Sequence, residues 1–154
     1  MHVSIVAVAG KPAAWLEHAE QQYLKRMPRG WRVRVDRIAP SRKGANAAVR
    51  QSDEWARLRK RFDPAARVVL LDERGQKFRS RDFASQVGSI RDRGHDLALV
   101  LGGPDGFGDV VRQNAEALWS LSSLTMPHEL ARLVLVEQLY RAHTILEGHP
   151  YHRD

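Results

Sequence analysis

The sequence contains no cysteine, which excludes disulfide bonds and thiolate metal sites. This absence is compatible with a reducing cytosol. The sequence also has no apolar run that approaches the ~18 residues needed to span a membrane. Its apolar start, residues 3–9, is too short for a signal peptide and has no basic leader. We therefore expect a soluble, cytoplasmic protein with no membrane partner.

Several binding and catalytic motifs are absent as well. There is no GxxxxGK[ST] phosphate loop, no GxGxxG dinucleotide loop and no nucleophile elbow. His149 and His152 lie three residues apart, but Pro150 disfavours a helical pair and no acid has ligand spacing, so we predict no metal. No repeat, linker or low-complexity tract divides the chain. We expect one domain over residues 1–154, which is long enough for a hydrophobic core.

Charge is spread unevenly along the chain. The protein has 25 Lys and Arg against 18 Asp and Glu, a formal net charge of +7. Residues 25–67 hold 14 of the basic residues and four acidic ones, whereas residues 97–154 hold four basic and seven acidic residues. A basic half is typical of a surface that binds a polyanion, usually RNA or DNA. The alternative is a solvated, arginine-rich surface without a partner.

Short apolar runs alternate with segments of helical periodicity. The run 97–101 is the clearest candidate for a buried strand, whereas charged and apolar residues alternate in 31–38, as in a half-exposed strand. This order predicts an open, mostly parallel α/β sheet with helices on both faces. We expect strands at 3–8, 31–38, 68–72, 97–101 and 118–121, helices at 13–27, 47–62, 80–94, 109–117 and 128–146, and a polar loop at 73–79.

The last predicted helix, 128–146, is apolar almost all round. A helix at the surface of a single domain has a polar face, so this one is expected to be buried on more than one side. Its second side is covered either by another subunit or by the rest of the same chain. The sequence alone leaves both possibilities open.

Two loops and the C-terminal tail carry the candidate site. Residues 102–106 read GGPDG and follow a predicted strand; Gly102 and Gly103 have no Cβ, so backbone and ligand can approach closely. Residues 121–126 read LSSLTM, a loop whose apolar side chains suit the flat face of adenine and whose backbone is free to bind its edge. The alternative for both is an ordinary connection without a ligand. Open α/β sheets bind ligands beyond the carboxyl ends of their strands.

The order of these motifs resembles one known family. GGPDG at 102–106, SLSSLTMPH at 120–128 and HPYHR at 149–153, together with VAVAGK at 6–11 and LDERG at 71–75, are similar to the SPOUT-class ribosomal RNA large subunit methyltransferase H family. The resemblance covers nearly all of the chain. Asp105 stands where Glu is common in the family, which keeps the charge.

The resemblance implies a fold, a reaction and a cofactor. It implies a C-terminal trefoil knot, a homodimer that meets through the knotted region, and S-adenosylmethionine as the methyl donor. It implies methylation of N3 of a pseudouridine in 23S rRNA on the assembled 70S ribosome. By the same likeness, the residues expected to line the cofactor pocket are Leu71, Gly102, Gly103, Leu121, Ser122, Ser123, Leu124, Thr125 and Met126.

Methyl transfer to nitrogen requires little covalent help, because the sulfonium donor is already activated. The enzyme must align donor and acceptor and manage one proton. Arg132 and Arg153 are our candidates for contacts to an anion or a phosphate, and His152 is the candidate base. For each histidine the alternative is plain surface chemistry, and for His128 a position at a helix start. The complete set of catalytic candidates is His128, Arg132, Tyr151, His152 and Arg153, of which the tail residues are implicated through the resemblance.

Two rival functions remain at this point. A non-catalytic ribosome- or RNA-binding protein with a vestigial pocket would explain the basic half equally well, but not the two loops and the tail together. A nucleotide-dependent transferase that uses the glycine loop for phosphate would lack a P-loop lysine. An S-adenosylmethionine-dependent RNA methyltransferase accounts for all of these features and is the leading hypothesis.

Overall fold

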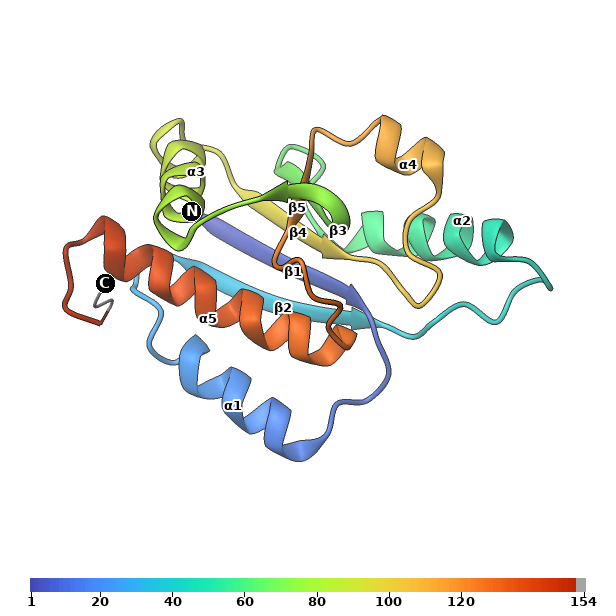
Figure 1. Cartoon of the computed structure of the whole chain (residues 1–154), viewed down its shortest axis with the longest axis horizontal. Coiled ribbons are helices and arrows are strands. Elements are labelled where there is room, and N and C mark those ends of the chain that lie inside the picture. Colours follow the sequence, from blue (N-terminus) through green and yellow to red (C-terminus); the bar gives the residue numbers. More distant parts are fainter. Residues whose placement is uncertain (152–154) are drawn as a thin grey trace.

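The computed structural model describes residues 1–151. Its centre is a five-stranded sheet in the order β2-β1-β4-β3-β5, in which every paired strand is parallel to its neighbour (Figure 1). The predicted open, parallel α/β sheet with helices on both faces is confirmed; the trefoil knot stays a prediction. The elements are β1 (His2–Val8), α1 (Ala14–Leu24), β2 (Arg32–Ile38), α2 (Ala47–Leu58), the short 3-10 turn η1 (Arg59–Arg61), β3 (Arg67–Lys77), α3 (Ser80–Asp92), β4 (Leu97–Leu101), α4 (Asp109–Gln113), β5 (Ala117–Ser120) and α5 (His128–Leu146).

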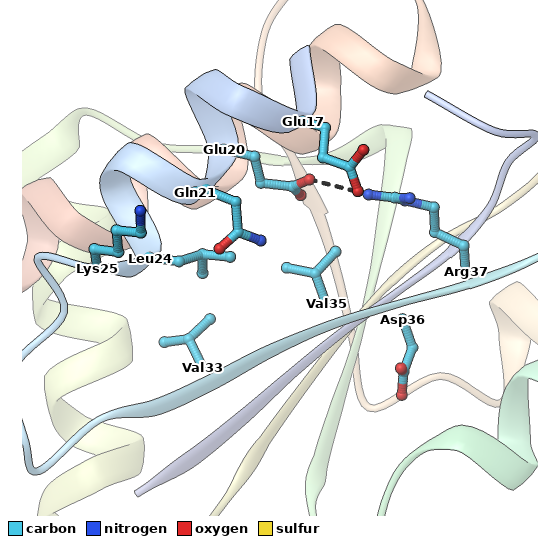
Figure 2. Close-up of a pocket in the computed structure, with 9 residues that line it drawn as sticks. All are labelled: Glu17, Glu20, Gln21, Leu24, Lys25, Val33, Val35, Asp36 and Arg37. Atoms are coloured by element: carbon cyan, nitrogen blue, oxygen red, sulfur yellow. Dashed lines mark hydrogen bonds and ion pairs between the residues drawn. The ribbon is translucent and has the colours of Figure 1, made fainter. Parts of the chain in front are cut away.

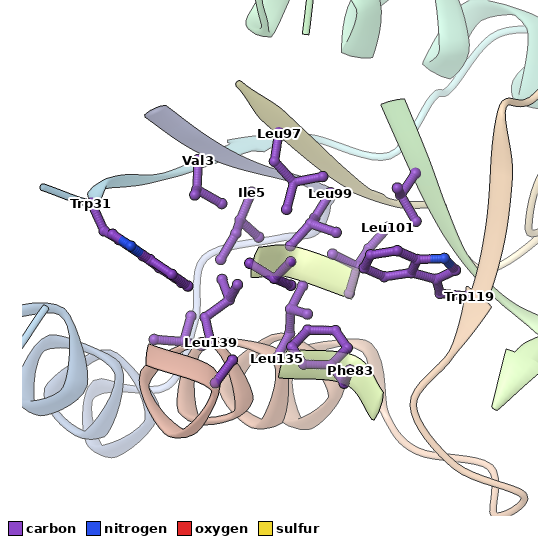
Figure 3. Close-up of a cluster of buried hydrophobic side chains, with 14 of the residues drawn as sticks. Val3, Ile5, Trp31, Phe83, Leu97, Leu99, Leu101, Trp119, Leu135 and Leu139 are labelled. Atoms are coloured by element: carbon purple, nitrogen blue, oxygen red, sulfur yellow. The ribbon is translucent and has the colours of Figure 1, made fainter. Parts of the chain in front are cut away.

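Alternation along the central strands separates two hydrophobic cores. In β1 and β4, Ile5 and Leu99 belong to the core beneath α1, α3 and α5, which Figure 3 shows, while Val6 and Val100 belong to the core beneath α2 and α4. This is the period-two pattern of a strand that is buried on both faces. All five residues of β4 are buried, as the apolar run 97–101 predicted. The carboxyl ends of the strands are therefore held in place by a hydrophobic core on each face of the sheet.

The apolar helix α5 is buried mainly within its own chain. It lies on the sheet between α1 and α3, and Leu135, Val136 and Leu139 are fully covered there. Its outer row is only partly covered: Leu130 is exposed and Leu133 half-buried. Burial inside the monomer thus accounts for one side of the helix, and a subunit interface on the outer side stays a prediction. Among the described residues, no helix is both long and apolar enough to cross a bilayer.

The predicted loop at 73–79 is wrong in its first part, because β3 continues to Lys77. Trp119 of β5 pairs with Leu71 and again with Gln76, so the four residues between them form a bulge. A Cβ on Gly75 would lie 2.5 Å from the carbonyl carbon of Trp119, so glycine is required for this close approach. The bulge places polar residues of the LDERG motif at the carboxyl edge of the sheet. A polar composition suggested a loop, but long-range pairing with β5 made a strand.

Candidate functional site

A cavity of about 640 Å³ lies at the carboxyl edge of the sheet. The bulge of β3 and the segments that follow β4 and β5 surround it, together with the start of α5 and one side chain of α2. Because these strands are parallel, their carboxyl ends meet at one edge, where α/β proteins bind ligands. The lining residues are Gln51, Leu71, Asp72, Glu73, Arg74, Leu101, Gly102, Gly103, Pro104, Asp105, Gly106, Phe107, Gly108, Asp109, Arg112, Ser120, Leu121, Ser122, Leu124, Thr125, Met126, His128 and Ala131.

The glycine loop after β4 is a tight turn. The N–H of Gly106 donates to the carbonyl of Gly103 at 2.9 Å, and Pro104 occupies the position in such a turn that favours proline. Gly106 has a φ of +67°, a conformation that side-chain-bearing residues rarely adopt. A Cβ on Gly102 would lie only 3.1 Å from the carbonyl carbon of Gly106. The turn therefore needs glycines for its own geometry and presents bare backbone to the cavity.

Helix α2 holds the glycine loop from outside. Arg50 donates from Nε to Oδ2 of Asp105 at 2.7 Å and from Nη2 to Oδ1 at 3.1 Å, and Gln51 donates to the carbonyl of Asp105 at 2.6 Å. The bidentate hydrogen bond from Arg50 holds the pKa of Asp105 below its ordinary value and raises the pKa of Arg50. We call this arrangement of Arg50, Gln51 and Asp105 the loop clamp. It ties the turn to a helix rather than leaving it free.

Glu54 closes the floor beneath the same loop. Its side chain is buried, and Oε1 accepts from the backbone N–H of Ser41 at 2.8 Å. A Cβ on Gly103 would lie 2.7 Å from Oε2 of Glu54 and 3.0 Å from Cγ1 of Val8. Gly103 therefore lies in a space that excludes even a methyl group. The carboxylate of Glu54 thus lies between the glycine loop and the loop 39–46, which contains Ser41.

A second ion pair braces the opposite wall. Arg112, at the end of the short helix α4, contacts Oδ2 of Asp72 from Nε at 2.7 Å. Asp72 belongs to the β3 bulge and its side chain is only 4% exposed. A pair this well covered, with near-ideal geometry, fixes the bulge relative to α4. The cavity is therefore walled by two charged pairs that reach it from different helices.

The loop 121–126 forms the apolar side of the cavity. Ser120 donates its hydroxyl to the carbonyl of Ser122, and the N–H of Leu124 donates to the Ser122 hydroxyl, both at 2.9 Å. Leu124 is 78% exposed and lies at the rim. The structure brings together most of the residues predicted to line one pocket, and Ser123 is the exception. Those that line the cavity are Leu71, Gly102, Gly103, Leu121, Ser122, Leu124, Thr125 and Met126.

The catalytic candidates separate into different places. His128 lines the cavity at the first residue of α5. Arg132 does not: it is 1% exposed, and its Nε contacts Oε1 of Glu20 at 2.9 Å. The structure thus contradicts the prediction that Arg132 offers its guanidinium to a substrate anion, because the carboxylate of α1 already occupies it. The sequence does not show that Arg132 and Glu20, which are 112 residues apart, are buried together between two helices.

Figure 2 shows the surroundings of that ion pair, a hollow between α1 and β2. Glu20 reaches toward Arg37, whose Nη2 lies 3.3 Å from Oε2 of Glu20. Glu20 therefore accepts from both Arg37 and Arg132, and it connects α1 to β2 and α5. This network stabilises the packing of α1 and takes no part in the carboxyl-edge cavity.

Tyr151 lies at the far end of α5 from the cavity. Its hydroxyl donates to Oε1 of Glu137 at 3.3 Å, and its ring packs on Tyr140 with centroids 4.8 Å apart. Burial, with a hydrogen bond to Tyr23, raises the pKa of Tyr151 to about 12. The 19 residues of α5 span about 28 Å at 1.5 Å per residue, so the cavity is out of reach within one chain. The predictions for His152 and Arg153 lie outside the described residues.

Several residues of the site were not predicted from the sequence. Arg50 and Gln51 had no motif that distinguished them from other polar residues of α2. Asp72 and Arg112 are 40 residues apart, and periodicity gives no sign of their contact. The one available signal was the LDERG motif, in which only Leu71 was assigned to the pocket. Long-range ion pairs of this kind become visible only when the strands are paired.

A parallel sheet with a ligand-sized cavity at its carboxyl edge is the arrangement of α/β proteins that bind small molecules at that edge. The family profile described as "Predicted SPOUT methyltransferase" matches residues 1–152. A protein of Polynucleobacter asymbioticus named Ribosomal RNA large subunit methyltransferase H is 41% identical over 154 residues, 100% of each chain. Its namesake in Chromohalobacter salexigens is 42% identical and covers 99% of this chain and 100% of its own.

The chain belongs to the SPOUT methyltransferases and, within them, to the ribosomal RNA large subunit methyltransferase H family. It is therefore a methyltransferase, as the motifs predicted. Among solved structures, a Bacillus anthracis protein described as a candidate RNA methyltransferase matches with a TM-score of 0.51 at 11% identity, over 97% of this chain and 96% of that one. This last likeness shows the shared fold alone.

Proposed function

We propose that the protein methylates N3 of a pseudouridine in 23S rRNA, on the assembled 70S ribosome in the cytoplasm, with S-adenosylmethionine as donor. The observation that carries this proposal is the single cavity in which the glycine loop and the loop 121–126 meet. The relatives' name, which specifies large-subunit ribosomal RNA, supports the substrate class. The net charge of +7 supports a polyanionic substrate.

The residues of the cavity fit S-adenosylmethionine. A volume of about 640 Å³ is in the range of small-molecule sites. Leu121, Leu124 and Met126 offer apolar contact for a flat base, and Gly102 and Gly103 leave room for close approach of a ligand to the backbone. When bound, this cofactor would supply an activated methyl group on a positively charged sulfur.

The chain's own task is alignment and the fate of one proton. The loop clamp and the Asp72–Arg112 pair fix the two walls, so a bound donor and the acceptor nitrogen are held in one orientation. His152 remains our candidate for the base that accepts the proton leaving N3, and His128, the one histidine among the described lining residues, is the alternative. A weakly acidic N3 reacts as its anion, which Arg153, our candidate for contacts to an anion, would stabilise.

We further propose a homodimer in which the tail of one copy completes the cavity of its partner. Tyr151 lies about 28 Å of helix away from the cavity of its own chain, and the outer row of α5 is incompletely covered. Subunit mixing tests this. A Leu124→Asp chain, altered at the exposed rim of the cavity, and a chain lacking 151–154 should each be inactive, whereas mixed dimers should recover about a quarter of the sites. If the mixture stays inactive while both variants remain folded dimers, the composite site is wrong.

The proposed reaction has a direct test. Ribosomes that lack the modification are incubated with labelled S-adenosylmethionine and the protein, and digested 23S rRNA is analysed by mass spectrometry. One new methyl on a pseudouridine supports the proposal. Cofactor binding without transfer to ribosomes overturns the substrate and points to another RNA. Absence of cofactor binding overturns the reaction and favours an RNA-binding protein with a vestigial pocket.

A further inference from the structure

A groove of about 420 Å³ lies on the α2 side of the edge strand β2, apart from the cofactor cavity. Its walls come from the end of β2 and from the junction of α2 with η1. Four of the six lining residues are cationic and none is acidic. They are Arg37, Ile38, Ala39, Arg57, Lys60 and Arg61, and we call this feature the β2–η1 groove.

The position of β2 in the sheet explains why the groove is open. β2 is an edge strand, so β1 covers only one of its sides. Arg32 and Arg34 alternate with the apolar residues of the strand and stay exposed on the face that α2 does not fully cover. Arg34 donates from Nη2 to the carbonyl of Arg61, which joins the strand to η1.

Two guanidinium groups are held in place and keep an unused donor. Arg57 donates from Nη1 to the carbonyl of Ala39 and from Nε to Oδ2 of Asp53, both at 2.9 Å. Its Nη2 is buried and has no hydrogen-bond partner among the described residues; Nε of Arg37 is in the same state. A buried donor without an acceptor is costly unless a ligand supplies one. Both groups thus meet one requirement of an anion site.

Three nearby carboxylates are paired with cations, two of them with groove residues: Glu20 contacts Arg37, and Asp53 contacts Arg57. Asp36 lies 3.2 Å from Nε of Arg34, and Asp53 contacts Lys43 at 2.7 Å as well as Arg57. The hydrogen bond from Lys43, followed by that from Ser41, lowers the pKa of Asp53 to about 2. Lys60 and Arg61 are exposed, and no ion pair to their side chains occurs among residues 1–151. The groove therefore keeps an excess of positive charge.

We propose that the β2–η1 groove binds the phosphate backbone of the substrate RNA beside the target nucleotide. The inference rests on the proposed function, because it assigns the surface on which that RNA docks. Gln51 lines the cofactor cavity and Arg57 lines the groove on the same helix, six residues apart, about 9 Å along the axis. About three nucleotides of a helical strand span that distance.

The layout of the cations favours a polymer over a small anion. A pocket for free phosphate has donors that converge on one point. Here the cations are spread over three elements: Arg37 in β2, Arg57 at the end of α2, and Lys60 and Arg61 in η1, with Arg59 exposed beside them. Cations spread over several elements match the repeated charges of a nucleic acid backbone.

The test compares two double variants of equal charge. Lys60→Gln with Arg61→Gln removes groove cations that make no ion pair in the described chain. The control, Arg26→Gln with Arg93→Gln, removes two exposed cations that follow the C-terminal ends of α1 and α3, at the opposite edge of the sheet. Binding to a 23S rRNA transcript is measured over a salt series, cofactor binding by calorimetry, and methyl transfer to unmodified ribosomes by KM and kcat.

The groove variant should raise KM for ribosomes about tenfold at unchanged kcat and cofactor affinity. Its slope of log K against log salt should fall by roughly 1.4 to 1.8, since two phosphate contacts are lost. The control should match wild type. Equal behaviour of the two double variants overturns the groove, whatever the wild type does. Wild type without methyl transfer overturns the proposed function, while a groove-specific loss of RNA binding would still support the groove. Inorganic phosphate that titrates into the groove with micromolar affinity would make it a small-anion site and overturn RNA docking.

Discussion

Two arginine–carboxylate contacts of nearly the same geometry serve different ends in this molecule. Arg132 and Glu20 are buried between α5 and α1, with 1% and 2% of their side chains exposed. Arg50 and Asp105 hold the glycine loop, with 28% and 27% exposed. Removing one partner of a buried pair leaves the other charge unpaired and shielded from solvent, which is strongly destabilising. A half-exposed pair is screened by solvent and contributes little to stability. The first pair therefore maintains the fold, and the second orders the site.

The largest effect is expected from breaking the buried pair. Arg132→Met leaves Glu20 with only Arg37 as a partner, so the free energy of unfolding should fall by about 3 kcal/mol. The double variant Glu20→Leu with Arg132→Met should recover part of this loss, because the only cation left without its carboxylate is Arg37, whose side chain is 26% exposed and reaches solvent. Urea denaturation followed by circular dichroism measures both. A stable Arg132→Met protein that has lost methyl transfer would contradict the structural role and restore Arg132 as a catalytic candidate.

The next largest effect is expected from a substitution at Gly103, where the glycine loop packs on Glu54. Gly103→Ala places a methyl group 2.7 Å from Oε2 of Glu54, so stability should fall by about 1–3 kcal/mol through overpacking. A double-mutant cycle with Glu54→Ala isolates the clash, since the two changes together should cost less than their sum. Strict additivity of the two free energies would show that Glu54 does not limit the space at Gly103.

A smaller effect is expected from the half-exposed pair. Asp105→Asn should weaken cofactor binding about fivefold, because the loop loses part of its preorganisation, while the unfolding midpoint stays nearly unchanged. Asp92→Asn is the matched control, because Asp92 pairs with Arg91 at the opposite edge of the sheet. Calorimetric titration of both variants measures the difference. An equal effect of the two substitutions would deny the clamp a role in binding.

The clamp also predicts a pH dependence. The pKa of Asp105 is lowered by the hydrogen bond from Arg50, so the carboxylate contributes above its ordinary pKa near 4. Its contribution is lost only as the pH falls through the lowered pKa of the folded protein. The contribution of Asp105 to cofactor affinity should thus be constant between pH 5 and pH 8, a range set by that ordinary pKa. A clamp that releases near neutral pH would be detected as a step in affinity that Asp105→Asn abolishes.

The smallest effect concerns the tail. The pKa of Tyr151 is raised to about 12 in the folded protein, against about 10 in an unfolded chain. The docking of Tyr151 therefore contributes fully below pH 10 and is lost as the pH rises toward 12. Ultraviolet titration of wild type minus Tyr151→Phe should show this late ionisation. A difference spectrum with a midpoint near 10 would place Tyr151 in solvent.

How far the sequence predicted the molecule depends on whether a feature is local. The apolar run 97–101 and the alternation in 31–38 were sufficient for β4 and β2, and GGPDG and LSSLTM located the cavity. The extension of β3 was missed, because it depends on pairing with Trp119. Arg132 was misplaced and the loop clamp overlooked for the same reason: each is made by a contact between residues at least 54 positions apart. Local motifs thus predict the loops that face a ligand, whereas the charged pairs that support these loops can be identified only from the folded structure.

The most direct test is one calorimetric experiment with S-adenosylmethionine and three proteins: wild type, Asp105→Asn, and Glu20→Leu with Arg132→Met. We expect that wild type binds the cofactor, that the double variant binds it equally well, and that Asp105→Asn binds it several times more weakly. Absence of binding by folded wild type, or a loss confined to the double variant, would contradict it.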